Sequence, residues 1–151
     1  MDLKFKVAAR ISRPVAEVFE AVANPEQLSD YFTTGGAQGR LETGATVMWD
    51  FHDFPGAFPV EVTEVIPNEK ISILWEAGDA SGDAGYKVAA TMTFEALEDN
   101  RTLVTISEGG WRPTEAGLKT SYGNCSGWTQ MLCALKMWVE HGINLREGFY
   151  K

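Results

Sequence analysis

The C-terminal part of the chain contains one long amphipathic stretch, from Ser121 to Glu147. Its apolar residues recur at the spacing that places side chains on one face of a helix: Trp128, Met131, Leu132, Leu135, Val139 and Gly142. A helix with so wide an apolar face needs a large apolar partner. The sequence therefore predicts a long C-terminal helix that covers another layer of the fold.

The residues before this helix alternate between apolar and polar side chains, which is typical of strands in a half-buried sheet. Such segments are predicted at 3–11, 45–51, 58–66, 71–75, 87–96 and 103–108. Turn residues separate most of them, and hairpin-length connections favour an antiparallel sheet. We expect the loop 53–56 to interrupt strand pairing, residues 78–85 to form a mobile loop, and residues 111–122 to be irregular.

Two short helices are predicted between the first strand and the rest of the sheet. Ser12 is a candidate cap for the first helix, and Pro14 suits its first turn. Asn24 and Pro25 begin the second, which stops before Gly35. The predicted class is α+β, with the order β, α, α, about six strands and a final helix that packs on the sheet.

Composition indicates a single domain over residues 1–151. With 151 residues, 44% of them apolar and 23% charged, the chain can bury a core without disulfides or metals. A net charge of −8 argues against a nucleic-acid partner. No segment approaches the roughly 20 apolar residues of a membrane span, and the N-terminus lacks a signal-peptide core, so we expect a cytoplasmic protein. Cys125 and Cys133 are too far apart on one helix for a disulfide and are expected to be reduced and packed.

Neither a metal nor another cofactor is expected. Asp50 and His52 share one side of a strand, but the only other histidine, His141, lies on the distant helix, and a metal site needs three or four ligands. We expect Asp50 and His52 to form a solvated strand face. The glycine-rich segment 78–85 lacks the Gly-Lys-Ser/Thr sequence that holds phosphate.

Several motifs follow one another along nearly the whole chain, and their order is more specific than any one of them. They are ARISRPVAEVF at 9–19, NPEQL at 24–28 with YF at 31–32, GATVMWDF at 44–51, VEVTEVIP at 60–67, ISILW at 71–75, and GW at 127–128 with Leu132, Leu135 and Lys136. In this order they resemble the START or Bet v 1-like (SRPBCC) helix-grip superfamily, and within it the bacterial family similar to the C-terminal domain of the activator of Hsp90 ATPase. The chain departs from that family at Tyr31-Phe32, where a Trp-Phe pair is usual, and in a compact loop at 34–39.

The resemblance implies a curved antiparallel sheet of about six to seven strands wrapped around the long C-terminal helix, with two short helices after strand one. In many relatives a cavity between the sheet and that helix binds a hydrophobic small molecule. The inward apolar side chains are the candidate cavity-lining residues: Trp49, Phe51, Phe58, Trp75, Met92, Phe94, Trp128, Met131, Leu132 and Leu135. The same side chains would equally fill an ordinary packed core.

Three functions are compatible with these patterns. The leading interpretation is binding of a hydrophobic or amphipathic small molecule in that cavity. One alternative is a protein-interaction module or co-chaperone of the Hsp90-activator type. Another is a cyclase or hydrolase-like enzyme that uses an inward carboxylate, for which Glu108 and Glu76 are the candidates. Binding is favoured over catalysis.

The far side of the C-terminal helix carries Cys133, Met137 and His141, and it is more apolar than a free surface needs. Either the two short helices or a second copy of the chain is expected to cover it. A homodimer is therefore a further hypothesis.

Overall fold

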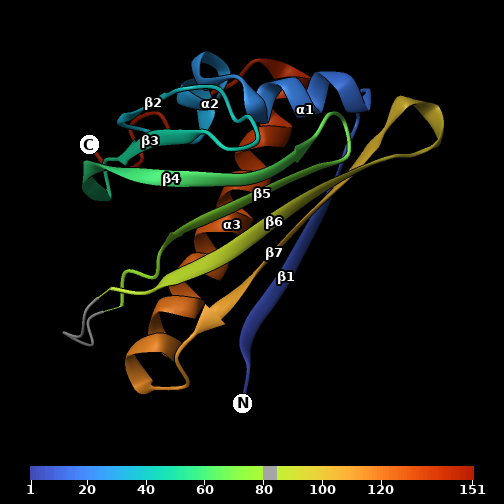
Figure 1. Cartoon of the computed structure of the whole chain (residues 1–151). Coiled ribbons are helices and arrows are strands. Elements are labelled where there is room, and N and C mark those ends of the chain that lie inside the picture. The colour runs from blue at the N-terminus through green and yellow to red at the C-terminus, as the bar shows by residue number, and fades with distance from the viewer. Residues whose placement is uncertain (80–84) are drawn as a thin grey trace.

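The computed structural model describes residues 1–79 and 85–151. Its elements are β1 (Leu3–Ile11), α1 (Val15–Ala23), α2 (Pro25–Tyr31), β2 (Gly36–Gln38), β3 (Thr46–Phe51), β4 (Phe54–Ile66), β5 (Lys70–Glu76), β6 (Lys87–Ala96), a short 3-10 turn (Glu98–Asn100), β7 (Thr102–Trp111) and α3 (Glu115–His141). Seven strands form one curved antiparallel sheet, and the long α3 runs along its concave side (Figure 1). The predicted α+β helix-grip fold is confirmed.

The strand order is β1-β7-β6-β5-β4-β3-β2, a meander from β2 to β7 with β1 added at the β7 edge. Neighbouring strands pair in register, for example Ile71 with Met92 and Met92 with Ile106. Because side chains alternate between the two faces of a strand, Val104, Ile106 and Glu108 of β7 all point toward α3. The alternation thus places one carboxylate on a mostly apolar face.

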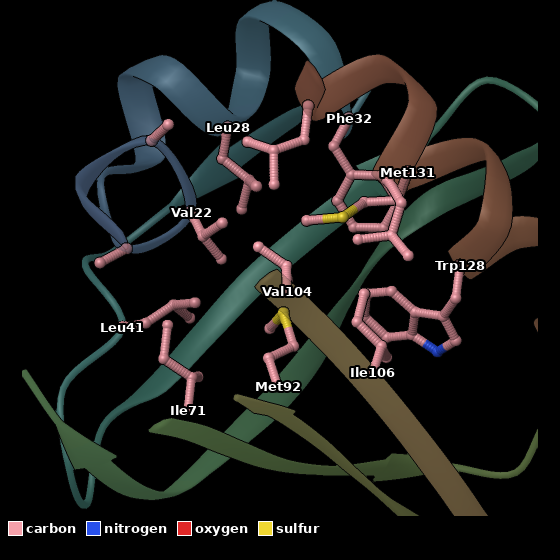
Figure 2. Packing of buried hydrophobic residues seen from close by; sticks show 14 of the residues in the cluster. Val22, Leu28, Phe32, Leu41, Ile71, Met92, Val104, Ile106, Trp128 and Met131 are labelled. Carbon is pink, nitrogen blue, oxygen red and sulfur yellow. The ribbon is translucent and has the colours of Figure 1, made fainter. Parts of the chain in front are cut away.

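The core lies between this face and the helices. The inner face of α3 contributes Trp128, Met131, Leu132 and Leu135, all of them buried. Figure 2 shows Trp128 and Met131 of α3 above Ile106 and Met92 of the sheet, with Val22 of α1 and Leu28 of α2 closing the other end. The predicted packing of an apolar helix face on the sheet is confirmed.

The bounds of α3 differ from the predicted Ser121–Glu147. The helix begins at Glu115 because Thr114 caps it, its Oγ1 accepting a hydrogen bond from the amide of Gly117 at 3.1 Å. It ends at His141 because Gly142 adopts a left-handed conformation with φ 68°. The prediction that residues 111–122 are irregular is wrong as well, because they include the last residue of β7 and the first turns of α3.

Two local predictions at the other end of the sheet also change. The segment 34–39 contains the short strand β2, whose sequence Gly-Ala-Gln has no apolar alternation to reveal it. The loop 53–56 does not interrupt pairing, because a tight turn at His52 and Asp53 lets Phe54 pair with Phe51. Most of the mobile loop predicted at 78–85 lies outside the described residues.

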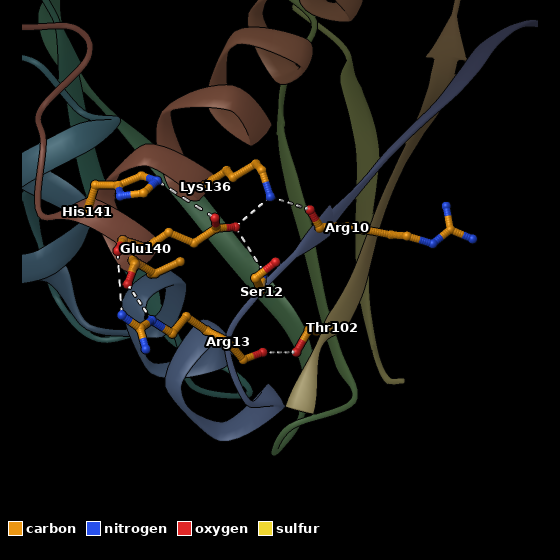
Figure 3. A network of polar contacts seen from close by, with 8 residues as sticks. Arg10, Ser12, Arg13, Thr102, Lys136, Glu140 and His141 are labelled. Atoms are coloured by element: carbon orange, nitrogen blue, oxygen red, sulfur yellow. Dashed lines mark hydrogen bonds and ion pairs between the residues drawn. The ribbon is translucent and has the colours of Figure 1, made fainter. Parts of the chain in front are cut away.

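A polar network holds the C-terminal end of α3 against the junction of β1 and α1 (Figure 3). Glu140 accepts hydrogen bonds from the amide of Ser12 at 2.8 Å and from Lys136 Nζ at 2.5 Å. Lys136 also donates to the carbonyl of Arg10 at 3.0 Å. The predicted cap at Ser12 is wrong, because the cap position of α1 is Pro14 and no side chain makes a capping hydrogen bond there. Burial opposes the charge of Glu140, but the bonds from Lys136 and Ser12 lower its pKa overall.

No helix in residues 1–79 and 85–151 is long and apolar enough to cross a bilayer.

Candidate functional site

A pocket of about 390 Å³ opens between the sheet and the N-terminal half of α3. Its walls come from the end of α2, the β3–β4 hairpin, the end of β5, α3 and the C-terminal segment after α3. Small-molecule sites usually measure about 300–1,000 Å³. The pocket therefore has the size of a small-molecule site, and it lies where the resemblance implied a cavity.

Five aromatic side chains of the lining contact one another in a closed circuit, which we call the aromatic belt: Phe32, Phe51, Phe58, Trp75 and Trp128. Ring centroids are 5.0 Å apart for Phe32 and Phe51, 5.9 Å for Phe51 and Phe58, and 6.0 Å for Phe58 and Trp75. Trp128 closes the circuit at 5.5 Å from both Trp75 and Phe32. These separations are typical of favourable aromatic pairs.

The belt is partly open to solvent. Phe58 and Trp75 are half-buried, and Phe54, a further lining residue at the tip of the hairpin, is 61% exposed. Asp53 and Glu76 also line the pocket, and both are exposed. The rim is therefore acidic and the interior wall aromatic.

The ten predicted cavity residues divide into two groups. Four of them, Phe51, Phe58, Trp75 and Trp128, line the pocket. The other six are buried in the core and are not part of the lining: Trp49, Met92, Phe94, Met131, Leu132 and Leu135. All ten point inward, but alternation does not reveal how deep a side chain lies. Their role in ligand binding stays a prediction.

Glu108 anchors the two tryptophans of the belt. Its carboxylate accepts hydrogen bonds from Trp75 Nε1 at 2.5 Å and Trp128 Nε1 at 3.0 Å, and from Asn124 Nδ2 at 2.9 Å. The residue is only 2% exposed. Because the three donors come from β5 and from two turns of α3, Glu108 fixes the helix and the belt to the same point of the sheet.

The environment of Glu108 perturbs its titration. Burial raises the pKa of its carboxyl group, and the hydrogen bonds from Asn124, Trp75 and Trp128 lower it only in part. The sequence singled out Glu108 and Glu76 as inward acids, and the structure places Glu108 inside and Glu76 on the rim. Among the described residues, Glu108 does not belong to the lining of the pocket. It holds Trp75 and Trp128 in position from behind the pocket lining.

The C-terminal segment contributes Arg146, which the sequence prediction missed. Its Nη1 donates to the carbonyl of Phe32 at 2.7 Å and its Nη2 to the hydroxyl of Tyr150 at 2.5 Å, and Tyr150 in turn donates to Gln130 at 3.0 Å. Arg146 lines the pocket yet is only 6% exposed. It was missed because the predicted helix ran through Glu147. A glycine after a long periodic run, as at Gly142, is the signal that ends such a helix.

Asp50 and His52 do not form a fully solvated face, since both are half-buried. Asp50 accepts a hydrogen bond from the amide of Gly56 at 3.0 Å, and the amide of His52 donates to Thr34 at 2.8 Å. The first contact lies within the β3–β4 hairpin, and the second joins the hairpin to the segment between α2 and β2. Within residues 1–79 and 85–151, no three His, Cys, Asp or Glu side chains lie close enough to hold a metal ion.

The outer face of α3 is only partly covered. Trp138 donates to Gln27 of α2 at 3.3 Å, so α2 covers one side. Met137 is half-buried, whereas His141 and Cys133 are exposed. The expectation that both cysteines are packed is wrong for Cys133, while Cys125 is half-buried and both thiols are free.

Comparison with known proteins places the chain among similar folds. The protein SSP2350 from Staphylococcus saprophyticus is 26% identical over 97% of this chain and 96% of its own, with a TM-score of 0.74. DynU16, a protein in the dynemicin biosynthetic locus, is 25% identical over 94% of this chain and 49% of its own, with a TM-score of 0.76. The Aha1 dimer from Colwellia psychrerythraea, at 20% identity, 92% and 97% coverage and a TM-score of 0.73, shows the fold alone.

No curated protein matches the sequence. A family model does match, over residues 12–140, and it is described as activator of Hsp90 ATPase homolog 1-like protein. The match runs from the junction of β1 and α1 almost to the end of α3, and so includes the belt and its Glu108 anchor. The chain therefore belongs to the activator of Hsp90 ATPase homolog 1-like family, as its motifs predicted.

Proposed function

We propose that this protein binds a hydrophobic or amphipathic small molecule in the pocket between β3–β5 and α3. The observation that carries the proposal is the aromatic belt around a space of about 390 Å³. Pockets lined by aromatic side chains with a few polar groups are the usual form of ligand sites.

The belt is also held in place before a ligand arrives. Two of its five rings are hydrogen-bonded to the buried Glu108, and each ring contacts two others. A preorganised wall loses less conformational entropy when it binds, which favours affinity. This rigidity is a further support for the binding role.

We expect Trp75→Ala to weaken binding of a neutral aromatic probe by about tenfold, or ~1.4 kcal/mol. The probe is N-phenyl-1-naphthylamine, whose fluorescence rises in apolar surroundings. Trp75 is half-buried in the belt and presents its ring to the pocket, so its removal takes away contact area. Fluorescence titration of the wild type and the variant measures the two dissociation constants.

Phe94→Leu is the matched control. Phe94 is buried in the core, with its ring 5.3 Å from that of Phe19, and it is not part of the pocket lining. This variant should lose some stability but keep the affinity of the wild type for the probe. Equal affinities for the wild type and Trp75→Ala, or no probe binding at all, would contradict the proposed function.

A role as a protein-interaction module is the second candidate, and the description of the matching family favours it. The partner would be a chaperone of the Hsp90 type. Such a role uses the protein surface and needs no occupied pocket. Trp75→Ala would then leave the effect on the chaperone's ATPase rate unchanged, which separates the two functions.

We also propose that the outer face of α3 pairs with a second copy of the chain. Its support is the apolar, half-covered Met137 between Cys133 and His141, together with a similarly folded protein described as a dimer. Sedimentation equilibrium at micromolar concentration is expected to show twice the 16.6 kDa mass of one chain, and Met137→Lys should restore the single-chain mass. A lone 16.6 kDa species for the wild type would rule the dimer out.

A further inference from the structure

We infer that the pocket selects amphipathic carboxylic acids, with the carboxylate paired to Arg146 and the apolar body against the aromatic belt. This inference rests on the proposed binding function and names the chemical class of its ligand. It begins from the C-terminal segment, which brings one cation to a pocket otherwise lined by aromatic rings, small or polar residues and two acids.

The charge of Arg146 is buried without a counter-charge. The residue is 6% exposed, and its two hydrogen-bond acceptors, the Phe32 carbonyl and the Tyr150 hydroxyl, are both neutral. No carboxylate in the described part of the chain forms an ion pair with it, and its buried Nε has no hydrogen-bond partner there. Removing a charge from water is costly unless the charge is paired and hydrogen-bonded.

Neighbouring aromatic rings compensate only part of this cost. Arg146 Cζ lies 5.1 Å from the ring centroid of Tyr150, 5.6 Å from that of Phe32 and 5.9 Å from that of Phe51. Cation–π contacts stabilise a guanidinium, but neutral rings supply no negative charge to pair with it. A carboxylate in the pocket would supply the missing negative charge.

Anchoring of the C-terminal segment does not by itself explain an arginine here. A neutral donor would satisfy the Phe32 carbonyl without burying a charge. The segment also has an anchor that does not involve the guanidinium, the hydrogen bond of 3.0 Å from Tyr150 to Gln130. The positive charge is thus the feature that remains unexplained until a ligand is considered.

The arrangement of charges gives a ligand one orientation. Arg146 is buried, whereas the two acids of the lining, Asp53 and Glu76, are exposed at the rim. A carboxylate is therefore attracted to the interior wall and repelled by the rim. Because the whole protein carries a charge of −8, long-range attraction does not favour an anion, and the preference must come from the direct pairing.

Two probes with the same ring system test this pairing: 1-naphthylacetate, which is anionic, and the neutral 1-naphthylacetamide. Each is titrated against the full chain loaded with N-phenyl-1-naphthylamine. For the wild type we expect the acid to displace the fluorophore at about tenfold lower concentration than the amide. In Arg146→Met the advantage of the acid should disappear, while the amide binds as before.

Tyr150→Phe is the matched control for disturbance of the C-terminal segment. It removes the hydrogen bonds of Tyr150 to Arg146 and Gln130 but keeps the guanidinium, so it should retain the preference for the acid. The inference is overturned if the acid and the amide displace equally from the wild type, if Arg146→Met keeps the preference, or if that variant loses both probes alike. In the first two cases the proposed function survives, whereas failure of the fluorophore to bind the wild type would remove the function itself.

Discussion

Replacing Trp128 with alanine is expected to lower the free energy of unfolding by about 4 kcal/mol, within the range of ~3–5 kcal/mol for a buried aromatic residue. Trp128 is 2% exposed and lies at 5.5 Å from the rings of both Phe32 and Trp75. Its removal opens a cavity between α3 and the sheet. It also takes one of three hydrogen-bond donors from the buried Glu108. Urea unfolding of both proteins, monitored by circular dichroism, measures this loss of stability.

The variant Trp128→Phe separates the contribution of ring packing from that of the hydrogen bond to Glu108. Phenylalanine keeps most of the ring contacts but cannot donate a hydrogen bond to Glu108, so we expect a loss of about 1–2 kcal/mol, close to that of one bond to a charged group. The probe N-phenyl-1-naphthylamine should still bind to this variant and bind poorly to Trp128→Ala. A loss below about 1 kcal/mol for Trp128→Ala would contradict the burial of this ring.

The fold could be predicted because its two strongest signals are local. Alternation along β1, β3, β5, β6 and β7 shows which side chains share a face, and the period of Trp128, Met131 and Leu135 shows the face of α3. Each of these two patterns extends over many buried residues, so one residue that departs from the pattern does not change the prediction. The structure confirms the sheet, the helix and their packing.

The depth of each inward side chain could not be predicted in the same way. Trp49 and Trp75 occupy inward positions on their strands, and their ring centroids are only 5.7 Å apart. Trp49 is 1% exposed in the core, whereas Trp75 is half-buried in the pocket wall. The exposure of each ring depends on which other elements pack over it, and the sequence of one strand does not contain that information.

Arg146 was missed because the C-terminal end of the long helix was predicted too late in the sequence. Gly142 lies at the spacing of the apolar stripe, so the periodicity continues through it although the helix does not. Once the helix ends there, the next residues turn back and bring Arg146 to Phe32, the residue that follows α2. A charge that sequence reasoning would leave in solvent thereby becomes part of the pocket wall.

Replacing Glu108 with glutamine is expected to lower the free energy of unfolding by about 2–3 kcal/mol near neutral pH, the scale of hydrogen bonds to a charged group. The carboxylate accepts from Trp75, Trp128 and Asn124. A glutamine side chain has one acceptor oxygen, and its amide NH₂ would face donors rather than acceptors. At least one buried donor would lose its partner. Thermal and urea unfolding of both proteins measures the change.

The pH dependence of this difference tests the same site independently. Because burial raises the pKa of Glu108 above its value in the unfolded chain, the folded protein binds this proton more tightly. The stability gained from that proton is fully present below the unfolded pKa and is lost as pH rises through the folded pKa. The wild type should therefore gain stability relative to Glu108→Gln as the pH falls from neutral toward the unfolded pKa of about 4.3. Glu20 and Glu140, whose pKa values are lowered, titrate in both proteins and cancel in the difference. A difference that shrinks on acidification would mean that Glu108 is not held in a desolvated site.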